Sequence, residues 1–308
     1  MSDKVKLHWP WLVAVWPGMG QVALAAGFYL MAKLEMHMLA EISSRELFDV
    51  EHVEIKAGLI RTGRMPRSRL FVWNDPTHTH DIILFIGEAQ PPLGKYAFCH
   101  KLIDYAKKLG VERVFTFAAM ATQMHPEHVS RVFAAATDEP TLADLKGLEL
   151  TLLENGHIGG LNGVLLGVAA EAGLRGSCLL GEMPHIFAEL PFPKASLAVL
   201  QVFTTMAGIE IDFQELSEQA ATVEQQMGQL LARVEQQMGM EAAPDEEPYA
   251  AEPTESRLRP EDERHIEQLF EQARRDRSKA YELKRELDRL DAFKDYEDRF
   301  LDLFKKSD

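Results

Sequence analysis

The 308-residue chain has little cysteine and few of the motifs that mark enzyme sites. Its two cysteines, Cys99 and Cys178, form no CxxC pair, so neither a disulfide framework nor a structural zinc site is expected. Both lie in apolar stretches, which predicts buried and unreactive thiols. The chain also lacks the P-loop of nucleotide-binding proteins, the GxSxG elbow of serine hydrolases and the HExxH pair of zinc proteases. We therefore predict no metal site and no catalytic residue.

Basic side chains are in the minority, with 33 Lys and Arg against 48 Asp and Glu and a formal net charge of -15. Binding to nucleic acid or to an anionic membrane needs clustered cations, so neither partner is expected. The longest apolar helical pattern, residues 22–39, is interrupted by Lys33, Glu35 and His37 and is not expected to span a membrane. No signal-peptide core precedes Pro10, which predicts a cytoplasmic protein.

Residues 11 to about 208 alternate short β-rich runs with helical patterns. Strands are predicted at 11–16, 53–60, 69–73, 81–87, 113–118, 130–136 and 177–180, and helices at 21–34, 96–109, 161–172 and 195–207. Alternation of this kind is typical of βαβ units, so we predict an α/β core domain over residues 1–211. Its sheet should be mainly parallel, with helices on both faces.

The composition changes after residue 211. Residues 212–239 have apolar side chains at spacings of three and four, which predicts an amphipathic helix. The segment VEQQMG occurs at 223 and again at 234, and an offset of eleven residues places both copies on one helix face. Residues 240–260 form an acidic, proline-containing linker, and 261–308 a charged helical or coiled-coil extension. The narrow apolar stripe of this extension predicts packing on another helix, of this chain or of a partner.

Gly18 and Gly20 open the first predicted helix in a GxGxxA pattern. Directly after a strand, this pattern is the turn of a dinucleotide site. Pro17 constrains the turn, however, and no clear strand ends in an acidic residue about twenty positions later. Close packing of strand on helix explains the two glycines equally well, so both interpretations stay open.

Polar residues follow two of the predicted strands. Glu88 and Gln90 come after the apolar run 81–87, and Glu182 comes after the run 177–180. In open α/β sheets ligands bind at the carboxyl ends of the strands, so these three side chains are the best polar candidates by position. Two carboxylates in one cleft could exchange protons with a substrate. Capping of the turns that follow is the alternative, and the sequence favours it.

The glycine-rich stretch 156–163 leads directly into the predicted helix 161–172. Backbone N–H groups of Gly159, Gly160 and Asn162 could hold an anion at the start of that helix. No Lys or Arg is adjacent to them, so a tight turn that lets two segments approach closely is the favoured interpretation.

In combination and order, these motifs resemble the proteasome assembly chaperone family, in the bacterial and archaeal branch related to the second eukaryotic assembly chaperone. The resemblance covers about residues 10–216 and is carried by the segments 16–20 (WPGMG), 83–91 (ending GEAQP), 135–137 (AAT), 159–163 and 181–184 (GEMP), with Leu190-Pro191 after them. It implies a three-layer α/β fold similar to nucleoside phosphorylases. It also implies a homo-oligomer, with a trimer as the form to expect, and protein binding without a cofactor.

Two functions follow from these observations. The first is a non-enzymatic, oligomeric protein-interaction or assembly-chaperone-like protein, and the alternative is a nucleoside- or nucleotide-binding enzyme that uses the carboxyl edge of the sheet. Proteasome-docking relatives resemble one another in a final hydrophobic-Tyr-X motif, whereas this chain ends FKKSD at 304–308. Docking on a proteasome through the C-terminus is therefore not expected.

Overall fold

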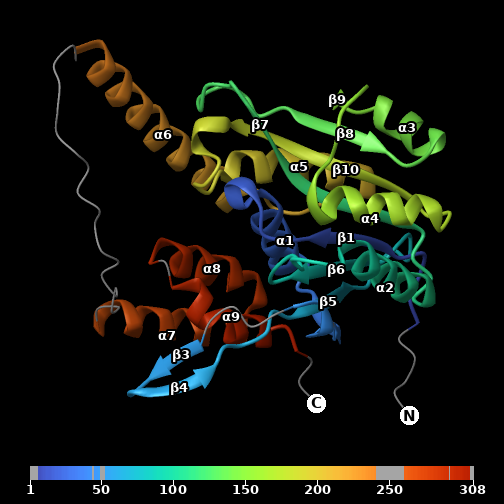
Figure 1. Cartoon of the computed structure of the whole chain (residues 1–308), viewed down its shortest axis with the longest axis horizontal. Helices are drawn as coiled ribbons and strands as arrows, with labels where there is room; N and C mark the ends of the chain where they lie inside the picture. Colours follow the sequence, from blue (N-terminus) through green and yellow to red (C-terminus); the bar gives the residue numbers. More distant parts are fainter. Residues whose placement is uncertain (1–5, 44, 49–52, 241–259, 291, 306–308) are drawn as a thin grey trace.

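An eight-stranded sheet runs through the molecule in the order β2-β5-β6-β1-β7-β10-β8-β9 (Figure 1). The computed structural model describes residues 6–43, 45–48, 53–240, 260–290 and 292–305. The strands of this sheet are β1 (Trp11–Val15), β2 (His37–Ile42), β5 (Ser68–Trp73), β6 (Ile82–Gly87), β7 (Arg113–Thr122), β8 (Val132–Ala136), β9 (Thr151–Leu152) and β10 (Arg175–Pro184).

The four central strands, β6, β1, β7 and β10, pair in parallel. On one side β5 and β2 continue the sheet in antiparallel fashion, and on the other β8 pairs antiparallel with β10. The predicted mainly parallel sheet with helices on both faces is confirmed, and the antiparallel flanks are an addition that the sequence did not indicate.

Helices cover both faces of the sheet (Figure 1). Leu12 and Ala14 of β1 belong to the apolar cluster formed with α2 (Lys95–Lys108) and α4 (Gly160–Glu171). Val13 and Val15 belong to the cluster formed with α1 (Val22–Lys33) and α5 (Pro193–Ala207). Successive side chains of a strand point to opposite faces, so a strand buried on both faces is apolar throughout.

Short elements at the margins differ from the prediction. The run 53–60, predicted as one strand, turns at Ala57 and Gly58 and forms a separate hairpin of β3 (Val53–Lys56) and β4 (Leu59–Thr62). Both turn residues have positive φ angles, 52° and 76°, which reverse the chain direction. The edge strand β2 was not predicted, nor was α3 (Glu139–Lys146), which begins where Asp138 accepts a hydrogen bond from the Thr141 N–H. The remaining short helices are η1 (Met19–Gln21), η2 (Arg45–Leu47), η3 (His185–Phe187) and η4 (Arg277–Lys279).

The C-terminal helices pack on the α/β body of the same chain (Figure 1). After α6 (Gln214–Met240), which contacts α5, the chain continues as α7 (Pro260–Arg275), α8 (Ala280–Arg289) and α9 (Phe293–Asp302). The predicted packing on another helix is confirmed, and that helix is α1. A coiled coil is not confirmed, because the extension consists of three short helices. Most of the predicted linker, residues 241–259, lies outside the described residues. None of the helices within the described ranges has the length and apolarity to cross a bilayer.

Gly181 of β10 allows α5 to approach the sheet. A Cβ atom there would lie 2.6 Å from the Ala195 carbonyl oxygen, whereas a Cβ at Gly167 of α4 would meet nothing within 4 Å. We expect Gly181→Ala to lower the free energy of unfolding by about 1–3 kcal/mol through overpacking. Gly167→Ala should raise it by about 0.5–1 kcal/mol, because alanine favours a helix. Urea unfolding of both variants measures the difference, and equal stability would contradict the close-approach argument.

Candidate functional site

Gln90 closes the carboxyl edge of the sheet between β1 and α4. Its Nε2 donates to the carbonyl oxygen of Pro17 at 3.3 Å, and its Oε1 accepts from the Leu161 N–H at 3.2 Å. A Cβ atom on Gly160, which has a φ of 67°, would lie 2.9 Å from the same Oε1. The structure therefore brings Gln90 and Gly160, two of the predicted site residues, together. The neutral side-chain amide of Gln90 therefore accepts the Leu161 N–H, one of the donors that an anion at the start of α4 would use.

Asn162 lies one residue beyond this contact. Its backbone carbonyl accepts from the Thr116 hydroxyl at 3.3 Å, while its side-chain Oδ1 is buried and has no hydrogen-bond partner among the described residues. Gly159 precedes α4 in extended conformation with open space around it. Asn162 thus has a buried side-chain oxygen that no described residue satisfies.

The turn at Gly18 and Gly20 is filled by the segment that follows β10. The Gly20 N–H donates to the Ala188 carbonyl at 2.7 Å, and the Gly20 carbonyl accepts from the Phe192 N–H at 2.9 Å. A Cβ on Gly20 would lie 2.7 Å from the sulfur of Met183. Gly18 is extended and has open space around it. Because the Gly20 backbone groups bond to protein, the arrangement supports the close-packing interpretation.

Glu182 is held by a dense set of donors and is only 2% exposed. Arg131 donates to both carboxylate oxygens, at 2.7 and 2.6 Å, and the Thr122 hydroxyl donates at 2.8 Å. The hydrogen bonds from Arg131 lower the pKa of Glu182. An ionised and fully bonded carboxylate suits a structural role better than proton transfer.

Glu88 belongs to a different cluster and shares none of these partners. Its buried carboxylate accepts from Arg64 at 2.6 Å and from the Arg67 N–H at 2.9 Å, and it lies 3.2 Å from an Arg69 guanidinium nitrogen. The two carboxylates considered for joint acid–base work thus have separate partners. We call Arg64, Arg67 and Arg69 the arginine cluster.

The arginine cluster also holds the C-terminal helix α9. Asp298 of α9 accepts from Arg69 at 2.6 Å, lies 3.3 Å from Arg67 and pairs with Arg64. The neighbouring Glu297 has its pKa raised to about 7 by burial and by the charge of Glu88. Sequence reasoning missed this cluster because Arg69 and Asp298 are 229 positions apart and no local pattern links them.

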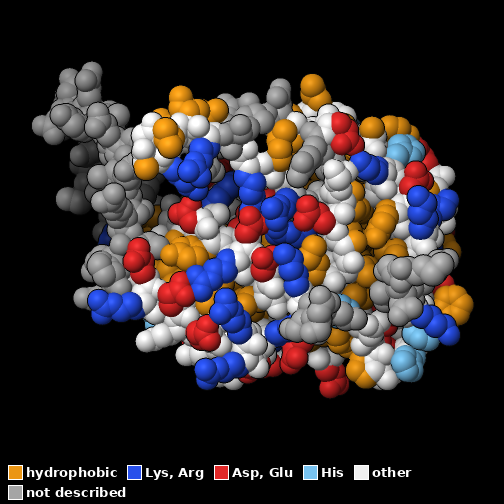
Figure 2. Space-filling view, turned by 90° about the horizontal axis from the view of Figure 1, so that it is seen from below, with side chains coloured by type: hydrophobic (Ala, Val, Ile, Leu, Met, Phe, Trp, Pro, Cys, Tyr) orange, Lys and Arg blue, Asp and Glu red, His pale blue; other side chains and the backbone are white. Residues whose placement is uncertain are grey.

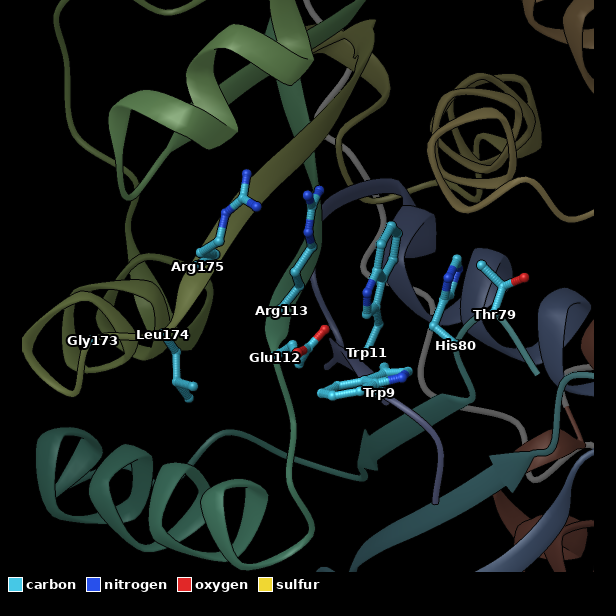
Figure 3. A pocket seen from close by; sticks show the side chains of 9 residues that line it. All are labelled: Trp9, Trp11, Thr79, His80, Glu112, Arg113, Gly173, Leu174 and Arg175. Atoms are coloured by element: carbon cyan, nitrogen blue, oxygen red, sulfur yellow. The ribbon is translucent and has the colours of Figure 1, made fainter.

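A concavity of about 500 Å³ lies at the opposite, amino-terminal ends of β1, β7 and β10 (Figure 3). The rings of Trp11 and His80 stack with centroids 4.0 Å apart, and the Arg113 guanidinium lies over Trp11. Arg113 and Arg175 both lie within 3.0 Å of an Asp144 oxygen, and Arg175 also lies 3.7 Å from an Asp138 oxygen, so two carboxylates offset the two guanidiniums. Burial lowers the pKa of His80. The sequence indicated no site here, and the paired guanidiniums give no excess of positive charge for an anion.

The cysteines are buried and free, as predicted. Burial raises the pKa of Cys99 and of Cys178 to about 12, so neither is a thiolate at neutral pH. Over the described parts of the chain, no group of three or more His, Cys, Asp or Glu side chains could hold a metal ion.

Replacing Glu182 tests its structural role. Because its folded-state pKa is lowered, the ionised carboxylate stabilises the fold above the ordinary Glu pKa, and this contribution is lost as the pH falls through the folded-state pKa. We expect Glu182→Gln to cost about 1–3 kcal/mol at pH 7 and less at pH 3.5, measured by urea unfolding. The exposed Glu189→Gln is the control. If Glu182→Gln were as stable as the wild type, or if its loss of stability were the same at both pH values, the structural role of the ionised carboxylate would be ruled out.

Glu297 should make the attachment of α9 weaker as the pH rises, whereas Glu182 stabilises the fold as the pH rises. The raised pKa means that the attached state retains its proton, so attachment weakens as the pH rises from about 4.5 to 7. Arg64, Lys294 and Arg69 oppose the effect of Glu88 only in part. We expect Glu297→Gln to match the wild type at pH 5 and to exceed its stability by up to about 3 kcal/mol at pH 8. The exposed Asp295→Asn should show no such divergence in the same unfolding measurement.

Three solved structures are similar to this chain over most of their own length. PbaB of Pyrococcus furiosus, an archaeal proteasome activator, is 26% identical with a TM-score of 0.63, covering 76% of this chain and 96% of PbaB. PbaA of the same organism, an archaeal homologue of proteasome-assembly chaperones, is 25% identical with a TM-score of 0.58 and the same coverage. A proteasome-assembly chaperone homologue of Mycobacterium tuberculosis shares the fold at 22% identity and a TM-score of 0.62, covering 71% of this chain and 94% of its own.

A curated relative, an uncharacterised protein of Methanocaldococcus jannaschii, is 29% identical over 145 residues, which are 47% of this chain and 55% of the relative. The chain therefore spans about half the length of this relative. The model of the PAC2 family matches residues 12–231, which is well over half of the chain and agrees with the resemblance seen in the motifs. The chain belongs to the PAC2 family.

Proposed function

We propose that this PAC2-family chain is a non-enzymatic, homo-oligomeric protein-interaction factor with an assembly-chaperone-like role. The observation that carries the proposal is the state of the carboxyl edge of the sheet. There Gln90 and the Gly20 backbone are bonded within the chain, while large apolar side chains on the neighbouring loops are exposed. Such an edge is suited to binding protein and leaves little for a small molecule to bond.

The exposed apolar residues lie on loops that are joined to one another. Met19 precedes the Gly20 that bonds to Ala188, and Ile186 and Leu190 flank that same residue. Val129, 83% exposed, lies on the loop between β7 and β8, where Lys194 of α5 donates to two carbonyl oxygens. Exposed apolar patches of this kind mark protein-interaction sites.

The similar structures support the interpretation that this chain binds proteins. PbaB is an archaeal proteasome activator and PbaA an archaeal homologue of proteasome-assembly chaperones, so both are linked to a protein complex. We infer that the partners of this chain are proteins, that it acts in the cytoplasm, and that its body assembles with further copies, as a trimer. The alternation of Lys and Arg with Asp and Glu over the face in Figure 2 agrees with this choice over nucleic acid, which favours a basic surface.

Light scattering after size exclusion tests the oligomer. We expect the full-length chain at micromolar concentration to exceed monomer mass, and Ile186→Asp with Leu190→Asp to shift it toward the monomer, because charges at an apolar interface oppose association. Leu59→Asp, on the exposed β3–β4 hairpin, is the control. A wild-type chain that is strictly monomeric would refute the oligomeric part of the proposal.

The alternative, a nucleoside- or nucleotide-binding enzyme, has one observation in its favour, the unpaired Oδ1 of Asn162. A thermal-shift screen with nucleosides, nucleotides and phosphate tests it, since a ligand at 100 times its Kd stabilises by about 2.7 kcal/mol. The alternative requires a shift that Asn162→Ala abolishes, and for NAD(P) one that Gly20→Val abolishes. We expect no shift at millimolar ligand.

A further inference from the structure

The C-terminal helices cover a face of the body formed by α1 and β5. We call residues 260–305 the appendage; they lie beyond the residues 12–231 matched by the family model. The Phe28 ring of α1 meets Phe293 and Phe300 at centroid distances of 5.3 and 5.7 Å. Tyr29 packs against Tyr281 at 4.4 Å. The body thus presents aromatic side chains that an amphipathic helix covers.

At the rim of this face, β5 and the segment before it contribute positive charge. The arginine cluster pairs with Asp298 of the appendage, and Arg69 is the innermost member, with a side chain only 2% exposed. The body therefore supplies the cations and the appendage the carboxylate. A helix that seats here needs aromatic residues on one side and an acidic residue where α9 has Asp298.

The contact between appendage and body contains features that a permanent core would avoid. Glu297 and Glu88 are partly buried like charges, and the charge of Glu88 contributes to the raised pKa of Glu297. The buried Lys284 of α8 pairs with Asp288 and places its ammonium 5.0 Å from the centroid of the Phe28 ring. A cavity of about 260 Å³ remains between α1 and the helices α8 and α9. Buried charges are often less stabilising than apolar residues of equal size, and polar, imperfect packing is typical of interfaces that separate.

We propose that the α1–β5 face is a docking site for an acidic amphipathic helix of another protein, and that the appendage occupies this site until such a helix displaces it. The inference deepens the proposed protein-binding function. The appendage belongs to the same chain as the face that it covers, so its binding there is intramolecular and any free helix must compete with it. Only a partner that binds tightly through both the arginine cluster and the aromatic residues can compete.

Charge reversal at Asp298 tests the inference in the full-length chain. Asp298→Arg places a cation among Arg64, Arg67 and Arg69, whereas the control Asp302→Arg lies on the same helix and loses only a contact with Lys305. Hydrogen exchange should show faster exchange in α7–α9 for Asp298→Arg, with α5 unchanged. Asp298→Asn provides a milder release if the reversal unfolds the chain. Equal protection of the appendage in Asp298→Asn and Asp302→Arg would overturn the inference.

Binding is measured with a fluorescent synthetic peptide of residues 279–305, which contains α8, α9 and Asp298, and with a scrambled peptide as its control. We expect at least tenfold tighter binding to Asp298→Arg than to wild type or Asp302→Arg, and loss of that gain when Arg67→Glu is added. Release of the appendage without any gain in binding would overturn the docking site.

Light scattering of the same variants separates this inference from the proposed oligomer. If Asp298→Arg gains mass in a way that Arg67→Glu reverses, a second copy fills the face, and the assignment to another protein is overturned. Peptide binding by a chain that is monomeric throughout would support the docking site while refuting the oligomer.

Discussion

Helix α1 is apolar around almost its whole circumference, and this constrains the rest of the molecule. Nine of its residues are buried, including the consecutive run Phe28 to Ala32. A helix of this kind must be covered on every side, because exposed apolar surface costs about 25 cal/mol per Å². The sheet covers one side through Val13 and Val15, α5 covers a second, and the appendage covers the third. The appendage is thus required to complete the core unless another helix takes its place.

The same helix also determines what happens at the carboxyl edge of the sheet. To bring α1 against β1, the chain turns at Gly20, and the segment after β10 bonds to both backbone groups of that glycine. Gln90 and the start of α4 close the neighbouring part of the edge. The position where a doubly wound fold usually binds its ligand is therefore taken up by contacts that hold the loops in place. Those loops then expose Met19, Ile186 and Leu190 to solvent.

Much of the body could be predicted from sequence because its signals are local. The apolar run of β6 and the glycines that end α2 and α5 each lie within a few consecutive residues, so the sequence pattern alone is enough to locate these elements. Gln90 was singled out by its position after a strand and Gly160 by the glycine-rich stretch, and the fold brings the two together. Glu88 and Glu182 were singled out in the same way, yet each has its own arginine partners. Their positions after two strands predicted that both carboxylates lie near the carboxyl edge of the sheet, but the arginine that pairs with each one depends on the tertiary fold.

The arginine cluster could not be predicted, because pairing between Arg69 and Asp298 depends on where α9 returns to the sheet. The run 53–60 was misread for a related reason, since a hairpin and a single strand share one apolar pattern until the backbone turns at Gly58. These are also the regions beyond the central parallel strands, where fewer contacts fix each element. Opposing interactions meet in α9: the aromatic contact with Phe28 favours attachment, and the repulsion between Glu88 and Glu297 opposes it. A contact balanced in this way can respond to pH and to a competing helix, whereas the central strands, buried on both faces, cannot.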